Sequence, residues 1–241
     1  MKDSKKIIII GASSGIGKEV ALLYAKRGDK VGITGRREHL LLDIKSQYPT
    51  NIFTSCFDVM GPDNITSIER LIQEMGGLDL LIFNSGYSDA SKELRWETEH
   101  TTIKTNVVGM VEIINYAFNY FSKKGWGQIA ITSSIAAIRG NSFAPAYSAS
   151  KAFISNYAEG LQIKAGRLKK DITVTDIKAG FINTKETPIK GRFWIASSHK
   201  AARQIVQGID KKKRVLYVTK RWQLIAIIMA VFPFRILKRI V

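Results

Sequence analysis

Seven short runs of aliphatic and β-branched residues alternate along the chain with longer segments of helical periodicity. Two of the runs, Ile7–Ile10 and Leu80–Phe83, are continuously apolar. Such strands occur where helices cover both faces of a sheet, because a strand with one exposed face alternates apolar and polar residues. The pattern predicts an α/β fold with a doubly wound, parallel, seven-stranded sheet. The predicted strands are Lys5–Ile10, Val31–Thr34, Ile52–Phe57, Leu78–Phe83, Gln128–Thr132, Ile172–Ile177 and Arg214–Val218.

The size and composition suit a single domain with a tail. A chain of 241 residues, 45% of them apolar, can bury a sizeable core without disulfide or metal cross-links. The single cysteine, Cys56, excludes an internal disulfide, and the scattered histidines show no zinc spacing, so we expect no metal and a reducing cytoplasm. The polar start, Met1–Lys6, predicts no signal peptide. Residues 1–219 are expected to form the domain and residues 220–241 the tail.

A turn rich in glycine and serine, residues 11–17, follows the first predicted strand and opens a helical segment, Lys18–Arg27. Glycines let the backbone turn tightly and approach a pyrophosphate, which free N–H groups at a helix N-terminus stabilise. The spacing Gly-x-x-x-Gly-x-Gly differs from the commonest Rossmann fingerprint. We expect a Rossmann-type dinucleotide site, with a tight turn that binds no ligand as the alternative. Its residues are Gly11, Ser13, Ser14, Gly15, Ile16 and Gly17.

Two arginines, Arg36 and Arg37, follow the second predicted strand. An acidic residue near this position would bond the ribose 2′-hydroxyl of NAD(H), whereas arginine suits the 2′-phosphate of NADP(H). We therefore expect NADP(H) as the cofactor. A solvated loop with two surface arginines is the alternative.

Tyr147 and Lys151 are four residues apart in a predicted helix, Ala146–Leu168, and so share one helix face. A nearby cation lowers the tyrosine pKa from about 10 and makes the phenol a usable acid or base. Alone, the pair is a weak signal, since accidental surface pairs are common. It gains weight from Ser134 just after the strand Gln128–Thr132, because ligands bind at the C-terminal ends of parallel strands.

Together these motifs resemble those of the short-chain dehydrogenase/reductase family, over about Lys5 to Val218. The resemblance implies an oxidoreductase that moves a hydride between NADP(H) and a carbonyl or alcohol. The matching residues are Gly11, Gly15, Gly17, Asp58, Val59, Asn84, Ser85, Gly86, Asn106, Ser134, Tyr147, Lys151 and the run Ala179–Thr184.

The resemblance assigns four catalytic residues. Tyr147 would exchange a proton with the substrate oxygen, and Ser134, 13 residues earlier, would hydrogen-bond that oxygen. Lys151 would contact the nicotinamide ribose and lower the tyrosine pKa, and Asn106 would support a water path to Lys151. Charge develops on the carbonyl oxygen during hydride transfer, so Ser134 and Tyr147 would be the donors that stabilise it.

The resemblance also assigns the cofactor cleft, in which Asp58 and Val59 would contact the adenine. Ala179 stands where the family usually has proline, and the loss of a fixed φ is expected to loosen the following loop. Ser85 replaces the usual alanine, a change expected to be harmless. Beyond the glycine-rich turn, the predicted cofactor residues are Arg36, Arg37, Asp58, Val59, Asn84, Gly86, Tyr147, Lys151, Gly180, Ile182 and Thr184.

The segment Lys185–Ser198 lies where the family has a mobile substrate lid, and it carries Phe193 and Trp194 among cations. Aromatic rings beside cations predict an apolar or amphiphilic carbonyl or alcohol substrate. Rings that simply pack on the core are the alternative.

The net charge of +17 favours an anionic partner, and ten Lys or Arg but only Asp210 among the acids lie from Arg203 to the end. Trp222–Phe234 carries no charge, is too short to span a bilayer and is flanked by basic residues. We expect this tail to form a helix on an anionic membrane surface, with a buried helix or a dimer contact as the alternative. No nucleic-acid motif accompanies the charge, so nucleic acid is not expected.

The leading hypothesis is therefore a cytoplasmic, peripherally membrane-associated enzyme, and the family resemblance implies a homodimer or homotetramer. A dinucleotide-binding sensor or scaffold without turnover is the rival. The intact set of four catalytic residues argues against that rival, because a binding module does not need all four.

Overall fold

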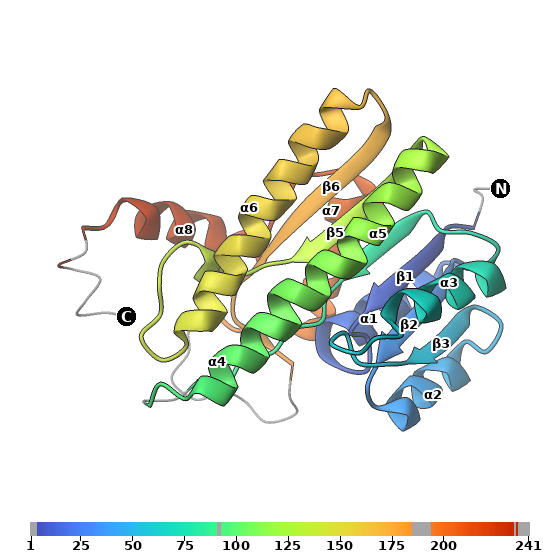
Figure 1. Ribbon diagram of the computed structural model, residues 1–241, viewed down its shortest axis with the longest axis horizontal. Helices are drawn as coiled ribbons and strands as arrows, with labels where there is room; N and C mark the ends of the chain where they lie inside the picture. The colour runs from blue at the N-terminus through green and yellow to red at the C-terminus, as the bar shows by residue number, and fades with distance from the viewer. Residues whose placement is uncertain (1–3, 91–92, 185–193, 234, 236–241) are drawn as a thin grey trace.

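The computed structural model describes residues 4–90, 93–184, 194–233 and 235. Its main sheet has seven parallel strands in the order β3-β2-β1-β4-β5-β6-β9, with helices on both faces (Figure 1). The predicted doubly wound, Rossmann-type sheet is confirmed. The strands are β1 (Lys6–Ile10), β2 (Lys30–Gly35), β3 (Ile52–Cys56), β4 (Leu80–Phe83), β5 (Trp126–Thr132), β6 (Asp171–Ala179) and β9 (Val215–Val218).

The two cores explain why the strands are continuously apolar. In β1, Ile7 and Ile9 pack with α1, α2 and α7, whereas Ile8 and Ile10 pack with α3, α5 and α6 on the opposite face. All four side chains are completely buried, because successive residues of a strand point to opposite faces. The helices are α1 (Gly15–Lys26), α2 (Glu38–Gln47), α3 (Asn64–Met75), α4 (Trp96–Ile103), α5 (Gly109–Lys124), α6 (Pro145–Arg167), α7 (Ser198–Asp210) and α8 (Trp222–Val231).

The boundaries differ from the prediction at two elements that matter for the site. Helix α1 begins at Gly15 rather than at Lys18, so the glycine-rich turn leads directly into its first turn. Strand β6 continues to Ala179 rather than ending at Ile177. After β6 the chain forms a short parallel pair, β7 (Ile182–Asn183) with β8 (Ala196–Ser197), that the sequence pattern did not predict.

Helix α8 rests on the domain along one side and is exposed along the other. Trp222 and Ala226 are buried at 1% and 2% exposure, so the start of the predicted tail helix belongs to the packed part of the protein. In the loop before α6, the guanidinium of Arg139 donates to the carbonyls of Met229, Ala230 and Phe232. These bonds satisfy carbonyls that a helix end leaves without partners. None of the helices within the described residues has the length and apolar character needed to cross a bilayer.

Candidate active site

Ser134 lies at the C-terminal end of β5. Its Oγ accepts a hydrogen bond from the N–H of Ala136 at 3.1 Å, which caps the short helix η2 (Ile135–Ala137). The same hydroxyl donates to the carbonyl of Ala179 at 3.2 Å and so ties the end of β5 to β6. These contacts hold a buried serine at the edge of the sheet where ligands bind in doubly wound folds.

Tyr147 and Lys151 come from the first two turns of α6. The helix begins at Pro145, a favourable first residue because its missing N–H would have no partner there. Glu99 of α4 accepts a hydrogen bond from the N–H of Ala146 at 3.0 Å, which places a carboxylate at the positive end of the helix. Lys151 Nζ lies 5.6 Å from the centre of the Tyr147 ring. The structure thus brings the phenol and the cation together.

Lys151 is 4% exposed, and its Nζ donates to the carbonyl of Thr132 at 2.9 Å. Burial lowers the pKa of Lys151 to about 8, because desolvation disfavours the charged form, while the negative charge of Asp176 opposes that shift. At neutral pH the group therefore still carries a proton. A positive charge beside the Tyr147 phenol favours the phenolate.

Asn106 lies in a π-helical segment, η1 (Lys104–Val108), between α4 and α5. Its side chain is completely buried. Its Oδ1 accepts from the N–H of Tyr87 at 2.8 Å, and its Nδ2 donates to the Tyr87 carbonyl at 2.9 Å and to Ser150 Oγ at 3.0 Å. Asn106 thereby links the loop after β4 to α6, one residue before Lys151. Isolated π-helical turns are frequent at functional sites.

The glycine-rich turn forms a cradle that side chains would fill. Gly11 and Gly15 have φ angles of +84° and +59°, which residues with a Cβ rarely adopt. A Cβ on Gly11 would lie 2.7 Å from the Cα of Ser85, and one on Gly15 would lie 3.0 Å from the Cβ of Thr184. A Cβ on Gly17 would overlap with the carbonyl oxygen of Gly11. The turn followed by the N-terminus of α1 therefore fits a dinucleotide pyrophosphate, with Ser13, Ser14 and Ile16 alongside.

The two arginines lie beside this turn. Arg37 Nη2 donates to Ser13 Oγ and Ser14 Oγ, both at 2.8 Å. Arg36 Nη1 forms an ion pair with Asp58 Oδ2 at 3.4 Å, and 67% of its side chain is exposed. Both guanidinium groups thus lie next to the glycine-rich turn, Arg37 through Ser13 and Ser14 and Arg36 through Asp58.

The other residues predicted to contact the cofactor lie along the same edge of the sheet. Asn84 Nδ2 donates to the carbonyl of Gly11 at 3.1 Å, which joins the ends of β4 and β1. A Cβ on Gly86 would lie 3.5 Å from both Asn106 Oδ1 and Lys151 Nζ, so Gly86 links the cofactor set to the catalytic set. Val59 is buried next to the partly exposed Asp58, and its carbonyl accepts from Asn64 Nδ2 at 2.9 Å.

The structure describes the segment after β6 as far as Thr184. Ala179, which stands where the family usually has proline, is the last residue of β6, and the N–H of Gly180 donates to the Val218 carbonyl at 2.6 Å. The loop expected to be loosened there lies largely outside the described residues, so that expectation stays a prediction. A Cβ on Gly180 would overlap with the Trp222 indole, so glycine is needed there for α8 to pack. Ile182 is buried in β7.

Most of the predicted lid, residues 185–193, lies outside the described residues. Trp194 is described and 42% exposed. Its ring packs edge-on against Trp222 with the centroids 6.2 Å apart, and the Arg221 guanidinium lies 5.8 Å from its centre. The Phe181 ring also packs edge-on against Trp222, with the centroids 5.1 Å apart. In the described part of the chain, no group of three or more His, Cys, Asp or Glu is placed to hold a metal ion.

The sequence comparison decides the family. The family model described as short chain dehydrogenase matches residues 5–190, more than half of the chain. The chain belongs to the short-chain dehydrogenase family. The family relation supports a dehydrogenase or reductase that acts on CH–OH and C=O groups with a nicotinamide dinucleotide.

Two relatives and one solved structure illustrate the family relation. An uncharacterized oxidoreductase of Myxococcus xanthus is 33% identical over 186 residues, which cover 75% of this chain and 73% of that protein. A protein of Arabidopsis thaliana named 11-beta-hydroxysteroid dehydrogenase 1A is 30% identical over 243 residues, 90% of this chain and 68% of its own. The crystal structure of a short-chain dehydrogenase from Streptomyces avermitilis shares the fold, with a TM-score of 0.82 at 22% identity, covering 95% of this chain and 92% of that one.

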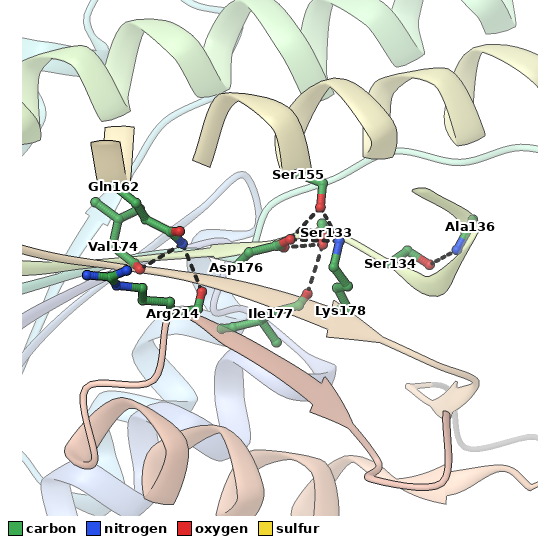
Figure 2. A network of polar contacts seen from close by, with 10 residues as sticks. All are labelled: Ser133, Ser134, Ala136, Ser155, Gln162, Val174, Asp176, Ile177, Lys178 and Arg214. Atoms are coloured by element: carbon green, nitrogen blue, oxygen red, sulfur yellow. Dashed lines mark hydrogen bonds and ion pairs between the residues drawn. The ribbon is translucent and has the colours of Figure 1, made fainter. Parts of the chain in front are cut away.

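Sequence reasoning missed a group of polar residues that lie next to the candidate site, between β5, β6 and α6. Asp176, Ser133, Ser155 and Lys178 converge beneath α6 (Figure 2). A signal for them was present in β6, where the positions facing α6 run from Ile172 and Val174 to two charged residues, but the strand prediction ended at Ile177.

Proposed function

We propose that this chain is an NADP(H)-dependent oxidoreductase that interconverts a carbonyl and an alcohol, with Tyr147 as the proton donor or acceptor. The observation that supports this most is the buried Lys151 ammonium 5.6 Å from the Tyr147 ring, at the sheet edge that also carries the glycine cradle. A binding module needs the cradle but has no use for a buried cation beside a phenol, because burying a charge is costly.

Each catalytic residue has a distinct task in this proposal. Ser134 turns its hydroxyl from the Ala179 carbonyl to the substrate oxygen, and Tyr147 donates a second hydrogen bond to that oxygen. Both donors stabilise the negative charge that develops there during reduction, and Tyr147 then delivers its proton. The Lys151 ammonium stabilises the phenolate that remains on Tyr147 after proton transfer. Asn106 holds the Tyr87 loop against α6. When bound, the nicotinamide supplies or accepts the hydride.

The preference for NADP(H) rests on Arg36 and Arg37. Arg37 is already oriented toward the glycine-rich turn by Ser13 and Ser14, and Arg36 remains largely exposed beside Asp58. Two guanidinium groups match the charge and the donor geometry of a ribose 2′-phosphate. NADH offers them no such group.

We further propose an apolar or amphiphilic substrate. The aromatic group of Phe181, Trp194 and Trp222 lies at the end of β6, with Arg221 beside it. The name of the Arabidopsis relative, a hydroxysteroid dehydrogenase, agrees with a substrate of this class.

The exposed side of α8 is proposed to rest on an anionic membrane surface. Leu224, Ile227, Ile228 and Val231 follow helical spacing and are between 37% and 76% exposed. Exposed Lys220 and Arg221 precede the helix, and Arg235 follows it. Apolar residues bordered by cations match acyl chains bordered by anionic headgroups better than they match a second, equally basic copy of this chain. By family relation, a homodimer or homotetramer is expected.

The proposal for catalysis is tested by Tyr147→Phe, which keeps the ring and removes the transferable proton. Turnover of an aliphatic, steroidal or lipid-like carbonyl, followed by NADPH absorbance, should fall by about 100-fold or more. NADPH affinity, measured by fluorescence titration, should change little. Substantial residual turnover would reject Tyr147 as the acid. Wild-type protein that binds NADPH but reduces nothing in a broad carbonyl panel would favour the sensor hypothesis.

A further inference from the structure

Strand β6 carries two charged residues where an apolar pattern would continue. Ile172 and Val174 belong to the core beneath α6, and the next two positions on that face are Asp176 and Lys178. Asp176 is 3% exposed, and its Oδ2 lies 2.9 Å from Lys178 Nζ. A buried ion pair is often no more stabilising than apolar residues of similar volume, so packing alone does not explain this pair.

The Asp176 carboxylate has hydrogen-bond donors from two other elements. Ser133 of the β5 end donates to Oδ1, and Ser155 of α6 donates to Oδ2 (Figure 2). Lys178 also donates to Ser155 Oγ. The carboxylate therefore connects three elements: β5, β6 and α6.

This network adjoins Lys151 from two directions. Along α6, Tyr147, Lys151 and Ser155 follow one another at intervals of four residues and so form one row on the helix. At β5, the Thr132 carbonyl that accepts from Lys151 Nζ belongs to the peptide bond that leads into Ser133. Asp176 thus lies on β6, which neighbours β5 on the side away from β1 and the glycine cradle.

We propose that Asp176 is a positioning residue for the Lys151–Tyr147 pair: its carboxylate is the buried counter-charge of the Lys151 ammonium and holds the β5 end through Ser133. This inference rests on the catalytic role proposed above for those two residues. Burial alone pushes the lysine toward its neutral form, and a neutral lysine no longer favours the phenolate of Tyr147.

Of the charged groups around Lys151 in the described part of the chain, Asp176 is the one that stabilises its protonated form. Among the described residues, β6 contributes Asp176 and Lys178, and α6 contributes Tyr147. From β5, from η1 and from the loop after β4, Lys151 meets the uncharged Thr132, Asn106 and Gly86. The negative charge of Asp176 raises the pKa of Lys151 against the larger effect of desolvation.

The test is Asp176→Asn, which keeps the shape and removes the charge. The phenolate absorbance of Tyr147, isolated by subtracting the titration of the matching Tyr147→Phe protein without cofactor, should appear at a pH higher by about one unit. The absorbance titration needs no turnover, so it tests Asp176 even if the proposed reaction is wrong.

Asp79→Asn is the matched control. Asp79 forms an ion pair with Lys124 at 2.6 Å and accepts from the N–H of Lys6 at 2.9 Å, just before β4, at the opposite edge of the sheet. It should lower the thermal midpoint but leave the Tyr147 titration unchanged. Lys178→Met should shift the titration opposite to Asp176→Asn, because it removes a competing cation, and it carries the test if Asp176→Asn does not fold. Equal titrations in wild type and in the folded variants of this network would overturn the proposal.

Discussion

Lys151 is the residue at which stability and function are in conflict. Its ammonium is buried beside Tyr147, and burial lowers its pKa from 10.5 to about 8. The lowering corresponds to about 3 kcal/mol of unfavourable free energy in the folded state at neutral pH. Strongly shifted pKa values of this kind cluster at functional sites, and the proposed mechanism places this positive charge next to the Tyr147 phenol.

Replacement of Lys151 by Met should therefore stabilise the fold near neutral pH, by a net of about 2 kcal/mol once the lost bond to the Thr132 carbonyl is counted. The pH dependence follows from the direction of the shift. Below about 8 the lysine is charged in both states and the full penalty applies, whereas between about 8 and 10.5 only the unfolded state keeps its proton. The wild type should thus gain stability relative to the variant as pH rises through this range.

Urea unfolding at about pH 7 and about pH 10 measures this difference. Lys164→Met, on the exposed face of the same helix, should leave the free energy of unfolding nearly unchanged at both values. A Lys151→Met protein that is less stable than wild type by the same amount at both pH values would contradict the prediction.

The proposed preference for NADP(H) also depends on single residues, Arg36 and Arg37. Their joint replacement by Ala removes the charge-assisted donors expected to meet the 2′-phosphate, so NADPH affinity should fall by about tenfold to 100-fold. NADH affinity should change little. Arg70→Ala, which removes an exposed cation from α3, controls for the general loss of positive charge. Equal affinity of the wild type for NADPH and NADH would contradict the proposed preference for NADPH, whatever the variants do.

Among the elements, the ten-residue helix α8 has one side that packs on the domain and one exposed side that is proposed to contact a membrane. On its buried side, Trp222 packs directly against Gly180. Near its C-terminal end, the Met229 carbonyl accepts a hydrogen bond from Arg139, which lies in the loop between β5 and α6. Because both contacts involve segments that flank the candidate site, removal of the whole helix would disturb the site as well as the surface. Substitutions on its exposed side test that surface alone.

Ile227→Glu with Val231→Glu places two anions on this exposed side. The wild type should sediment with anionic phosphatidylglycerol vesicles, less so as salt rises, since each surface-proximal cation contributes about 1 kcal/mol. The double variant should lose this binding, whereas Ile163→Glu, at an exposed position of α6, should keep it. A wild type that ignores the vesicles, together with a variant that turns a dimer into a monomer, would show instead that this side of α8 is a subunit contact.

At the scale of the whole molecule, the parallel sheet brings the residues of the candidate site together. The ends of β1, β2, β4, β5 and β6 point to one edge, so residues from Gly11 to Gly180 meet there although they are far apart in sequence. The fold thereby places the glycine cradle, the arginines and the Tyr147–Lys151 pair along one edge of the sheet, the edge where ligands bind in doubly wound folds.

The sequence by itself determined the features that depend on local pattern. Continuous apolar runs identified the strands, because both sheet faces are buried, and the spacing of Tyr147 and Lys151 placed them on one helix face. Family resemblance then assigned Ser134 and Asn106, whose roles remain predictions. The ends of elements were less certain: β6 extends two residues further than predicted, since pairing with β9 rather than local preference sets its end.

Tertiary structure alone decided which side chains meet from distant parts of the chain. Asp176 appeared as an ordinary polar residue in a strand until the β5–β6 register and the row on α6 placed Ser133, Ser155 and Lys178 around it. Arg139 and the end of α8 meet across 90 residues, and Gly180 is required by Trp222 rather than by a turn. Neither contact leaves a local signature, because burial and hydrogen bonding between distant segments depend on how the layers pack, not on the period of any one segment.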